Sequence, residues 1–263
     1  MGTVGCGGGA AGSRRAGVQA TRDGVRQTRS VPARSDPRPT DADEGGIGTR
    51  GESSLHAALK LIVSEPGDRF EVPVDGFVVD VVRGDTCIEV QTGGFAAMGN
   101  KLDRLLGDFH VHVVHPIAVD SWIERRDKPT RKSPKRGCLH DVFAELVSVP
   151  TMLDHPNLTI EVLLVQVDVL KVEDPTMRRR RGGWRTVDRR LRAVVDRHGL
   201  RTTADLVALL PAGLPDQWTT KDVADGARIP RRTAQQMAYV LKANGLAVEV
   251  GRDRAGSRYV TAG

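Results

Sequence analysis

The sequence predicts an α/β fold, in which a small mixed sheet is flanked by helices and is followed by a second, mainly helical domain. Residues 52–117 read as a helix, three short β-rich runs, a helix and a strand, an order typical of a layered α/β core. Residues 186–263 show helical patterns that end in a β-hairpin. The predicted organisation is a disordered tail (1–45), an α/β domain (46–175), a basic linker (176–185) and a C-terminal domain (186–263).

Composition restricts the class of protein. Residues 1–45 are rich in Gly, Arg, Ser and Pro and contain no aromatic residue, so they cannot bury enough apolar surface to fold. Lys and Arg number 39 against 33 Asp and Glu, a formal charge of +6 that suits a polyanionic partner such as DNA. The three cysteines are far apart and form no CxxC pair, which fits a reducing compartment, and no apolar run is long enough to span a membrane. We expect a cytoplasmic protein.

The elements of the α/β domain follow from periodicity and turn residues. An apolar stripe beginning near Glu52 predicts a first helix that ends at Val63. Three β-rich runs and a second apolar stripe come next, at 70–74, 77–82, 86–91 and 95–106. A strand at 110–114 should end before Pro116, because proline cannot donate to a strand ladder.

The second half of this domain is expected to hold a basic, proline-bearing loop, a helix and a long β-rich run. Their ranges are 127–137, 139–146 and 158–172. Arginines at 178–181, followed by two glycines, mark the expected linker.

The C-terminal domain is predicted from caps and helical spacing. Its expected elements are an amphipathic helix over 187–195, a short element at 206–210, a helix capped by a threonine near Thr219, and a helix over 231–244 ended by Gly245. Two strands, 246–250 and 257–260, flank a basic turn.

This helix–turn–helix with a β-hairpin resembles winged-helix DNA-binding domains. A helix fits the major groove, and hairpin arginines can reach the backbone or the minor groove. The alternative use of such a domain is protein contact, usually through a less basic surface. The residues that we expect to contact DNA are Arg231, Arg232, Thr233, Gln235, Gln236, Arg252, Arg254 and Arg258.

Two carboxylates stand out in the α/β domain. Asp80 lies at the end of one apolar run and Glu89 lies within the next, and a hairpin joins the two runs. Their side chains can therefore converge on one face. Charge in such apolar strands is costly unless it is paired or binds a cation, and two carboxylates with a backbone carbonyl suit Mg²⁺. The alternative is two solvated strand ends.

Residues 50–117 resemble the PD-(D/E)XK nuclease superfamily, especially its small members related to Holliday-junction resolvases and very-short restriction-type nucleases. The resemblance rests on the helix with Glu52, then Asp80, then eight residues, then Glu89-Val90-Gln91. It implies a restriction-endonuclease-like fold and a Mg²⁺ or Mn²⁺ ion held by Asp80, Glu89 and the Val90 carbonyl. Glu52 either completes this site or is an ordinary first-turn acid.

The chain departs from the family pattern at Gln91, where the family usually has lysine. Lysine supplies a positive charge that orients the attacking water, whereas glutamine supplies only a dipole. Lys101 on the following helix flanks the apolar stripe and could provide that charge. Otherwise the fold is kept for binding and catalysis is lost.

Three histidines, His110, His112 and His115, could in principle bind zinc, but the interleaved valines favour a half-exposed strand.

Two hypotheses follow from these observations. The first is a metal-dependent DNA endonuclease-like protein, in which Asp80, Glu89, Gln91 and Lys101 act on DNA delivered by the C-terminal domain. The second is a non-catalytic DNA-binding regulator, transcriptional or structural, that retains a nuclease-like fold. A homodimer is compatible with either hypothesis.

Overall fold

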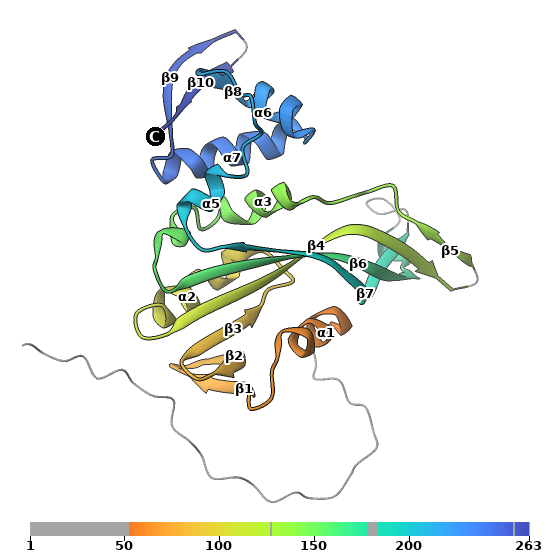
Figure 1. The fold of residues 1–263 in the computed structure, drawn as a ribbon. Coiled ribbons are helices and arrows are strands. Elements are labelled where there is room, and N and C mark those ends of the chain that lie inside the picture. The colour runs from red at the N-terminus through yellow and green to blue at the C-terminus, as the bar shows by residue number, and fades with distance from the viewer. Residues whose placement is uncertain (1–52, 127, 178–182, 255, 263) are drawn as a thin grey trace, which may run out of the picture.

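The computed structural model describes residues 53–126, 128–177, 183–254 and 256–262. The predicted tail, the arginines at 178–181 and Glu52 lie outside the described residues. Within the described part, the chain is mixed α/β. It has a seven-stranded mixed sheet with helices on both faces and a three-stranded antiparallel sheet near the C-terminus (Figure 1). No helix in these ranges is both long and apolar enough to cross a membrane.

The first half of the chain forms the predicted helix, β-meander, helix and strand. Its elements are α1 (Ser54–Val63), β1 (Arg69–Val74), β2 (Phe77–Arg83), β3 (Thr86–Val90), the short η1 (Phe95–Met98), α2 (Gly99–Leu105) and β4 (His110–Arg125). Ser53 caps α1 by accepting a hydrogen bond from the backbone N–H of His56. β1, β2 and β3 pair antiparallel in order, and β4 then pairs parallel to β3.

The second half of the large sheet consists of long strands. Its elements are β5 (Lys128–Lys132), η2 (Leu139–Val142), α3 (Phe143–Leu146), η3 (Met152–Asp154), β6 (Leu158–Glu173), η4 (Pro175–Met177) and β7 (Trp184–Leu200). The strand order is β1-β2-β3-β4-β6-β7, with β5 paired to the far half of β4. β6 runs parallel to β4 and antiparallel to β7.

The helix expected over 187–195 is wrong, because these residues lie in β7. Of the linker expected at 176–185, residues 178–182 lie outside the described residues, and Trp184 and Arg185 begin β7. The register with β6 shifts three times, so that Val187, Arg192 and Val195 have no ladder partner. At each such bulge the strict alternation of side chains between the two faces of the strand is interrupted. Leu191 and Val194, three residues apart, therefore face the same core, a spacing that imitates a helix. The large sheet extends to Leu200, well past the predicted domain boundary at 175.

Two further expectations for the large sheet are corrected. β4 continues through Pro116 to Arg125 instead of ending at the proline. Pro116 pairs with Leu163 of β6, and it lies between the stretch of β4 that pairs with β3 and the stretch that pairs with β5. A proline is tolerated at such an unpaired edge. The basic loop expected at 127–137 likewise contains the strand β5.

The C-terminal unit follows the predicted order from Leu206 onward. It contains α5 (Thr203–Val207), β8 (Trp218–Thr219), α6 (Thr220–Ala227), α7 (Arg231–Ala243), β9 (Ala247–Asp253) and β10 (Gly256–Thr261), and its sheet has the order β8-β10-β9. Thr219 caps α6 in a reciprocal arrangement with Asp222, as the threonine cap predicts. Gly245 adopts φ +69 just after α7, a conformation that favours glycine.

Two apolar clusters hold the fold together. The smaller lies between α1 and one face of the sheet, and includes Leu59, Ile88 and Val165. The larger covers the opposite face and continues without interruption into the C-terminal unit. α3 packs against α7 at this junction, and Asn244 Nδ2 donates to the Pro150 carbonyl at 2.7 Å. Figure 1 shows α1 on one side of the sheet and α3, with α7 beyond it, on the other.

The Cys87 thiol lies in the larger core and should be chemically inert in the folded protein. Burial, reinforced by the nearby charge of Glu89, raises the pKa of this thiol to about 11. We expect iodoacetamide at pH 8 to leave Cys87 unmodified in the native protein and to modify it in guanidinium, as read by peptide mass mapping. Modification of Cys87 at equal rates in both conditions would contradict the burial that the structure assigns to it.

Candidate functional site

Asp80 and Glu89 meet at the point where β2 and β3 stop pairing. The ladder between these strands runs from Arg83 and Thr86 to Val81 and Ile88, so Asp80 and Glu89 are the next residues along. Past Val81 and Ile88 the backbone ladder between β2 and β3 ends, and the Asp80 side chain bonds to the backbone of β3 instead. Asp80 Oδ2 accepts the N–H of Val90 at 2.8 Å. The Asp80 carboxylate is thus bonded to the backbone beside Glu89.

Each carboxylate also has a cationic or titratable partner from a different helix. His56 Nε2 of α1 lies 3.1 Å from Asp80 Oδ2. Lys101 Nζ of α2 lies 2.5 Å from Glu89 Oε1 and donates to the Val78 carbonyl at 2.6 Å. Because α1 and α2 cover opposite faces of the sheet, the two carboxylates take these partners from opposite sides of it.

The two carboxyl groups have opposite pKa shifts. Burial alone would raise the pKa of Asp80, but the hydrogen bonds from His56 and from the Val90 N–H outweigh it and hold the pKa below its ordinary value. Burial raises the pKa of Glu89 above its ordinary value, and the neighbouring Asp80 adds to this despite the opposing Lys101. Perturbed acids of this kind gather at functional sites as well as in structural ion pairs.

The Val90 carbonyl is directed toward β2, the strand that carries Asp80. Gln91 N–H donates to the Val114 carbonyl of β4 at 2.8 Å, so the peptide groups of Val90 itself point away from β4 and toward β2. The Val90 N–H confirms this direction by bonding to Asp80. Two carboxylates and one carbonyl are hard oxygen donors of the kind that Mg²⁺ prefers, with water and phosphate oxygens filling the other positions. The chemistry of these donors suits Mg²⁺, but the described residues contain no group of three or more His, Cys, Asp or Glu side chains that could hold a metal.

Gln91 does not contact either carboxylate among the hydrogen bonds of the described residues. Its side chain donates to the Gly94 carbonyl at 2.7 Å and its own carbonyl lies 2.7 Å from His115 Nδ1. Gln91 therefore fixes the loop between β3 and η1. Gln91 and Lys101 were the two residues expected to take the role of the family's lysine. Of these two, Lys101 contacts a carboxylate, that of Glu89.

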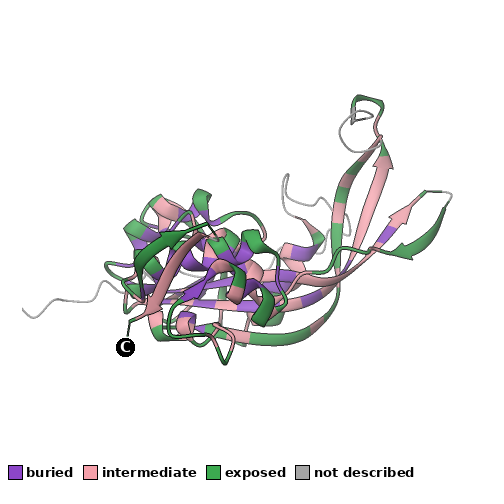
Figure 2. Cartoon of the chain, turned by 90° about the horizontal axis from the view of Figure 1, so that it is seen from above, coloured by how far each residue is buried: buried purple, intermediate pink, exposed green. Residues whose placement is uncertain are grey.

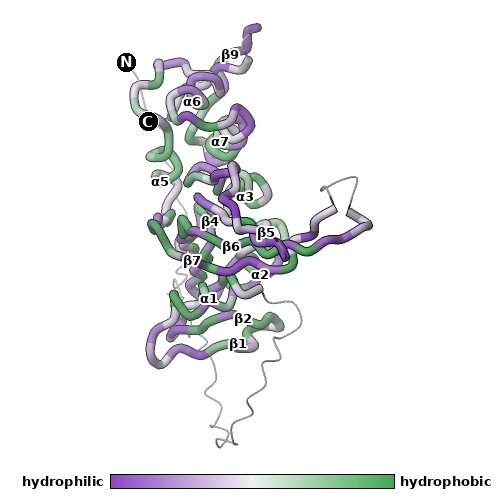
Figure 3. The backbone as a smooth tube through the Cα atoms, turned by 90° about the vertical axis from the view of Figure 1, so that its right-hand side faces the viewer, coloured by the Kyte–Doolittle hydropathy of each residue, from purple (hydrophilic) through white to green (hydrophobic). Residues whose placement is uncertain are grey.

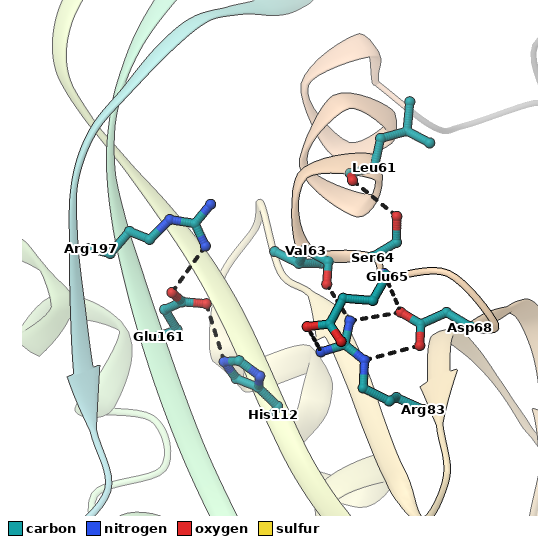
Figure 4. Close-up of polar contacts among 9 residues, drawn as sticks. All are labelled: Leu61, Val63, Ser64, Glu65, Asp68, Arg83, His112, Glu161 and Arg197. Carbon is teal, nitrogen blue, oxygen red and sulfur yellow. Dashed lines mark hydrogen bonds and ion pairs between the residues drawn. The ribbon is translucent and has the colours of Figure 1, made fainter.

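The histidines on β4 have separate surroundings. His112 Nε2 lies 3.3 Å from Glu161 of β6, which Arg197 of β7 also contacts at 3.4 Å (Figure 4). His115 is buried on the opposite face, in an edge-on contact with Phe95, and burial lowers its pKa. His112 and Glu161 therefore form a cross-strand pair. Figure 4 also shows Arg83 joining Asp68 to the carbonyl at the end of α1.

The residues expected to contact DNA are mostly exposed. On α7, Arg231, Arg232 and Gln235 are exposed, and Gln236 is half-buried. Thr233 is largely buried, with only 6% of it exposed, and it lines the same cleft as Gln236, so its contact with DNA stays a prediction. The same stripe of α7 continues with Tyr239, 50% exposed, and Lys242, which pairs with Glu249 of β9.

The hairpin of the C-terminal unit carries two different kinds of arginine. Arg252 and Arg254 are exposed. Arg258 donates two hydrogen bonds to Asp253, at 2.8 and 2.5 Å, so its charge is largely compensated. A basic hairpin is present, but its charge is concentrated at the tip.

Two residues that sequence reasoning missed are His56 and Tyr239. His56 lies in the first turn of α1, beside the apolar stripe, and nothing local distinguishes it from a surface histidine. Tyr239 was detectable, because it lies four residues after Gln235 on the same helix face. The signal for His56 exists only once α1 is packed against the sheet, where His56 meets Asp80.

A cleft of about 760 Å³ links the end of β3 to the start of α7. Thr92, which follows Gln91, and Arg232 and Gln236 of α7 are among the residues that line it. Its charged lining includes the cations Lys135, Lys171 and Arg189 and the acids Asp141 and Glu145. Asp80, Glu89 and Lys101 are not among the described residues that line this cleft.

Together the fold and the site define a mixed α/β protein with a paired-carboxylate centre in its large sheet and a compact helical unit at its C-terminus. The chain belongs to the family described as Domain of unknown function (DUF8091), whose model matches residues 53–201. This range coincides with α1 to β7. An uncharacterized protein from Treponema pallidum (strain Nichols) is 34% identical over 208 residues, which cover 76% of this chain and 82% of that protein. No solved structure matches the chain.

Proposed function

We propose that the protein is a metal-dependent DNA endonuclease-like enzyme that hydrolyses phosphodiester bonds. The observation that carries the proposal is the meeting of Asp80, Glu89 and Lys101 where β2 and β3 separate. The helix, three antiparallel strands, helix and parallel strand around them are in the order of the restriction-endonuclease-like core of PD-(D/E)XK nucleases. Opposed pKa shifts at the two carboxyl groups agree with a working site.

In this proposal the chain's own groups have distinct roles. Asp80, Glu89 and the Val90 carbonyl would hold Mg²⁺ or Mn²⁺, which supplies Lewis acidity and a more acidic bound water. Lys101, held by the Val78 carbonyl, is positioned to orient the attacking water and to offset charge that develops on the phosphate. His56 keeps Asp80 ionised and fixes its rotamer.

The C-terminal unit supports DNA as the substrate. Its helix, strand, two helices and hairpin, with the strand order β8-β10-β9, resemble the arrangement of a winged-helix domain. Arg231, Arg232, Gln235 and Tyr239 of α7 form an exposed donor-bearing stripe, and Arg252 and Arg254 extend the tip of the hairpin. Arg232 and Gln236 line the same cleft as Thr92, which lies two residues after Val90 in the chain.

The test is nicking of supercoiled plasmid. The full-length protein should convert supercoiled to open-circular plasmid in Mg²⁺ or Mn²⁺ and not in EDTA. Asp80→Asn, purified in parallel, should reduce the rate by about 100-fold or more, because it removes one metal-binding charge. Absence of nicking by the wild type, or equal nicking by the variant, would overturn the proposal.

A second function, a non-catalytic DNA-binding regulator, is favoured by one specific observation. Both carboxylates already have nitrogen partners, His56 and Lys101, so the cluster could be a structural network. This alternative expects DNA binding that is independent of divalent metal, unchanged in Asp80→Asn, and without nicking.

A further inference from the structure

The far ends of the long strands extend beyond the apolar core. Here they are called the arm, defined as the described residues of 121–133, 168–177 and 183–192. The buried residues of the sheet end at Ile123 and Val167, and every residue of β5 is exposed. Figure 2 shows these strand ends reaching out from the body of the protein, and Figure 3 shows β5 in the hydrophilic colours. Strands that bury so little apolar surface need another reason for their length.

The arm is strongly basic. Its described residues include ten Lys and Arg side chains against five Asp and Glu side chains; Asp127, between Arg126 and Lys128 in the sequence, lies outside the described residues. The cations are Arg125, Arg126, Lys128, Arg131, Lys132, Lys171, Arg185, Arg189, Arg190 and Arg192, and the acids are Glu124, Asp168, Glu173, Asp174 and Asp188.

The carboxylates of the arm are used within the sheet. Arg190 pairs with Glu124, Arg192 Nε lies 2.6 Å from Asp168, and Arg185 lies 3.3 Å from Asp174. These pairs tie β7 to its neighbours. In the described ranges, no ion pair is found for Arg126, Lys128 or Arg131, which surround the turn between β4 and β5. The uncompensated charge is therefore concentrated at the β4–β5 hairpin.

Two tryptophans of the arm contact cations. The Arg125 guanidinium lies 4.3 Å from the centre of the Trp184 ring, and Lys128 lies 5.3 Å from it. Arg192 and Lys132 lie 4.1 and 5.1 Å from Trp122, and these two cations also pair with Asp168 and Asp120. At Trp184 the cation–π contacts orient the cations and leave their charge available. They also occupy the indole rings, which would otherwise serve as stacking platforms for single-stranded bases.

We propose that the arm is a second DNA-binding surface, which contacts the phosphate backbone of duplex DNA through the β4–β5 hairpin. A two-stranded β-ribbon has the width to follow a groove of B-DNA, and exposed Arg and Lys side chains along it match the regular spacing of phosphates. This proposal shares the DNA partner of the proposed function, but it does not require the carboxylate site. It gives the protein two separate contacts with DNA, one at α7 and one at the arm.

The experiment measures equilibrium binding of the full-length protein to a fluorescent duplex by anisotropy, in EDTA so that cleavage plays no part. The arm variant is Arg126→Gln with Arg131→Gln. The control variant is Arg69→Gln with Arg201→Gln, two exposed arginines outside the arm, which changes the net charge by the same amount. A circular dichroism melt of both variants establishes that they are folded.

We expect the arm variant to bind duplex about tenfold or more weakly near 0.1 M salt. The slope of log K against log salt should become shallower by about 0.9 for each phosphate that the variant no longer neutralises. The control should keep its affinity within about twofold. Equal weakening in both variants, or a stronger effect on single-stranded than on duplex DNA, would overturn the proposal. The binding assay tests the arm, and plasmid nicking by the wild-type protein tests the carboxylate site. Either proposal can therefore be overturned without the other.

Discussion

Glu89→Gln is expected to reduce metal-dependent plasmid nicking by about 100-fold or more, while the free energy of unfolding stays within about 1 kcal/mol of the wild type. The loss of nicking follows because a neutral amide is a poor ligand for a divalent cation. The measurements are plasmid nicking in Mn²⁺ and urea unfolding at pH 7.

The small stability change follows from two opposing effects. The pKa of Glu89 is raised in the folded state, so the ionised group costs stability, and this cost grows as pH rises from the unfolded pKa through the folded one. Glutamine removes that cost at neutral pH. It also weakens the attraction to Lys101, but it still offers an oxygen as a hydrogen-bond acceptor.

The matched control is Glu161→Gln on β6. Glu161 is also a half-buried sheet carboxylate with nitrogen partners, His112 and Arg197, but it lies outside the proposed metal site. It should lose no nicking activity. If Glu89→Gln retained more than half of the wild-type rate, or if both variants lost activity equally, the assignment of Glu89 as a metal ligand would be wrong.

Trp218→Ala is expected to lower the free energy of unfolding of the C-terminal unit by about 3–5 kcal/mol. Only 1% of Trp218 is exposed, and its ring stacks on Tyr259 with centroids 4.9 Å apart. Its Nε1 donates to Thr261 Oγ1 at 3.0 Å. Truncation would leave a cavity beneath β8 and β10 and would remove the side chain that fixes β8 to the hairpin. Urea unfolding followed by circular dichroism measures the effect.

Trp218→Phe separates packing from hydrogen bonding. The phenyl ring keeps most of the stacking on Tyr259 and loses the bond to Thr261, so we expect a cost of about 1–2 kcal/mol. An alanine variant as stable as the phenylalanine variant would show that the ring contributes little packing energy, contrary to its place in the larger core.

Local patterns predicted much of the fold because the relevant signals lie within a few residues of each other. The Arg83-Gly84-Asp85 turn joins two apolar runs, and this alone places Asp80 beside Glu89, since hairpin register is set by the turn. The cap at Thr219 and the glycine at Gly245 likewise mark the ends of α6 and α7 through local hydrogen bonds and backbone conformation.

Tertiary structure decided β7 and the partners of the carboxylates. Bulges at Arg192 and Val195 give β7 a helix-like apolar spacing, and only its pairing with β6 makes it a strand. His56 and Lys101 reach the carboxylates from helices on opposite faces of the sheet, and Thr233 is buried by the body of the protein. The sequence by itself determined the local elements and the hairpin that brings two acids together. Strand order, bulges and the partners of the carboxylates depend on contacts between residues far apart in the chain, which no local pattern encodes.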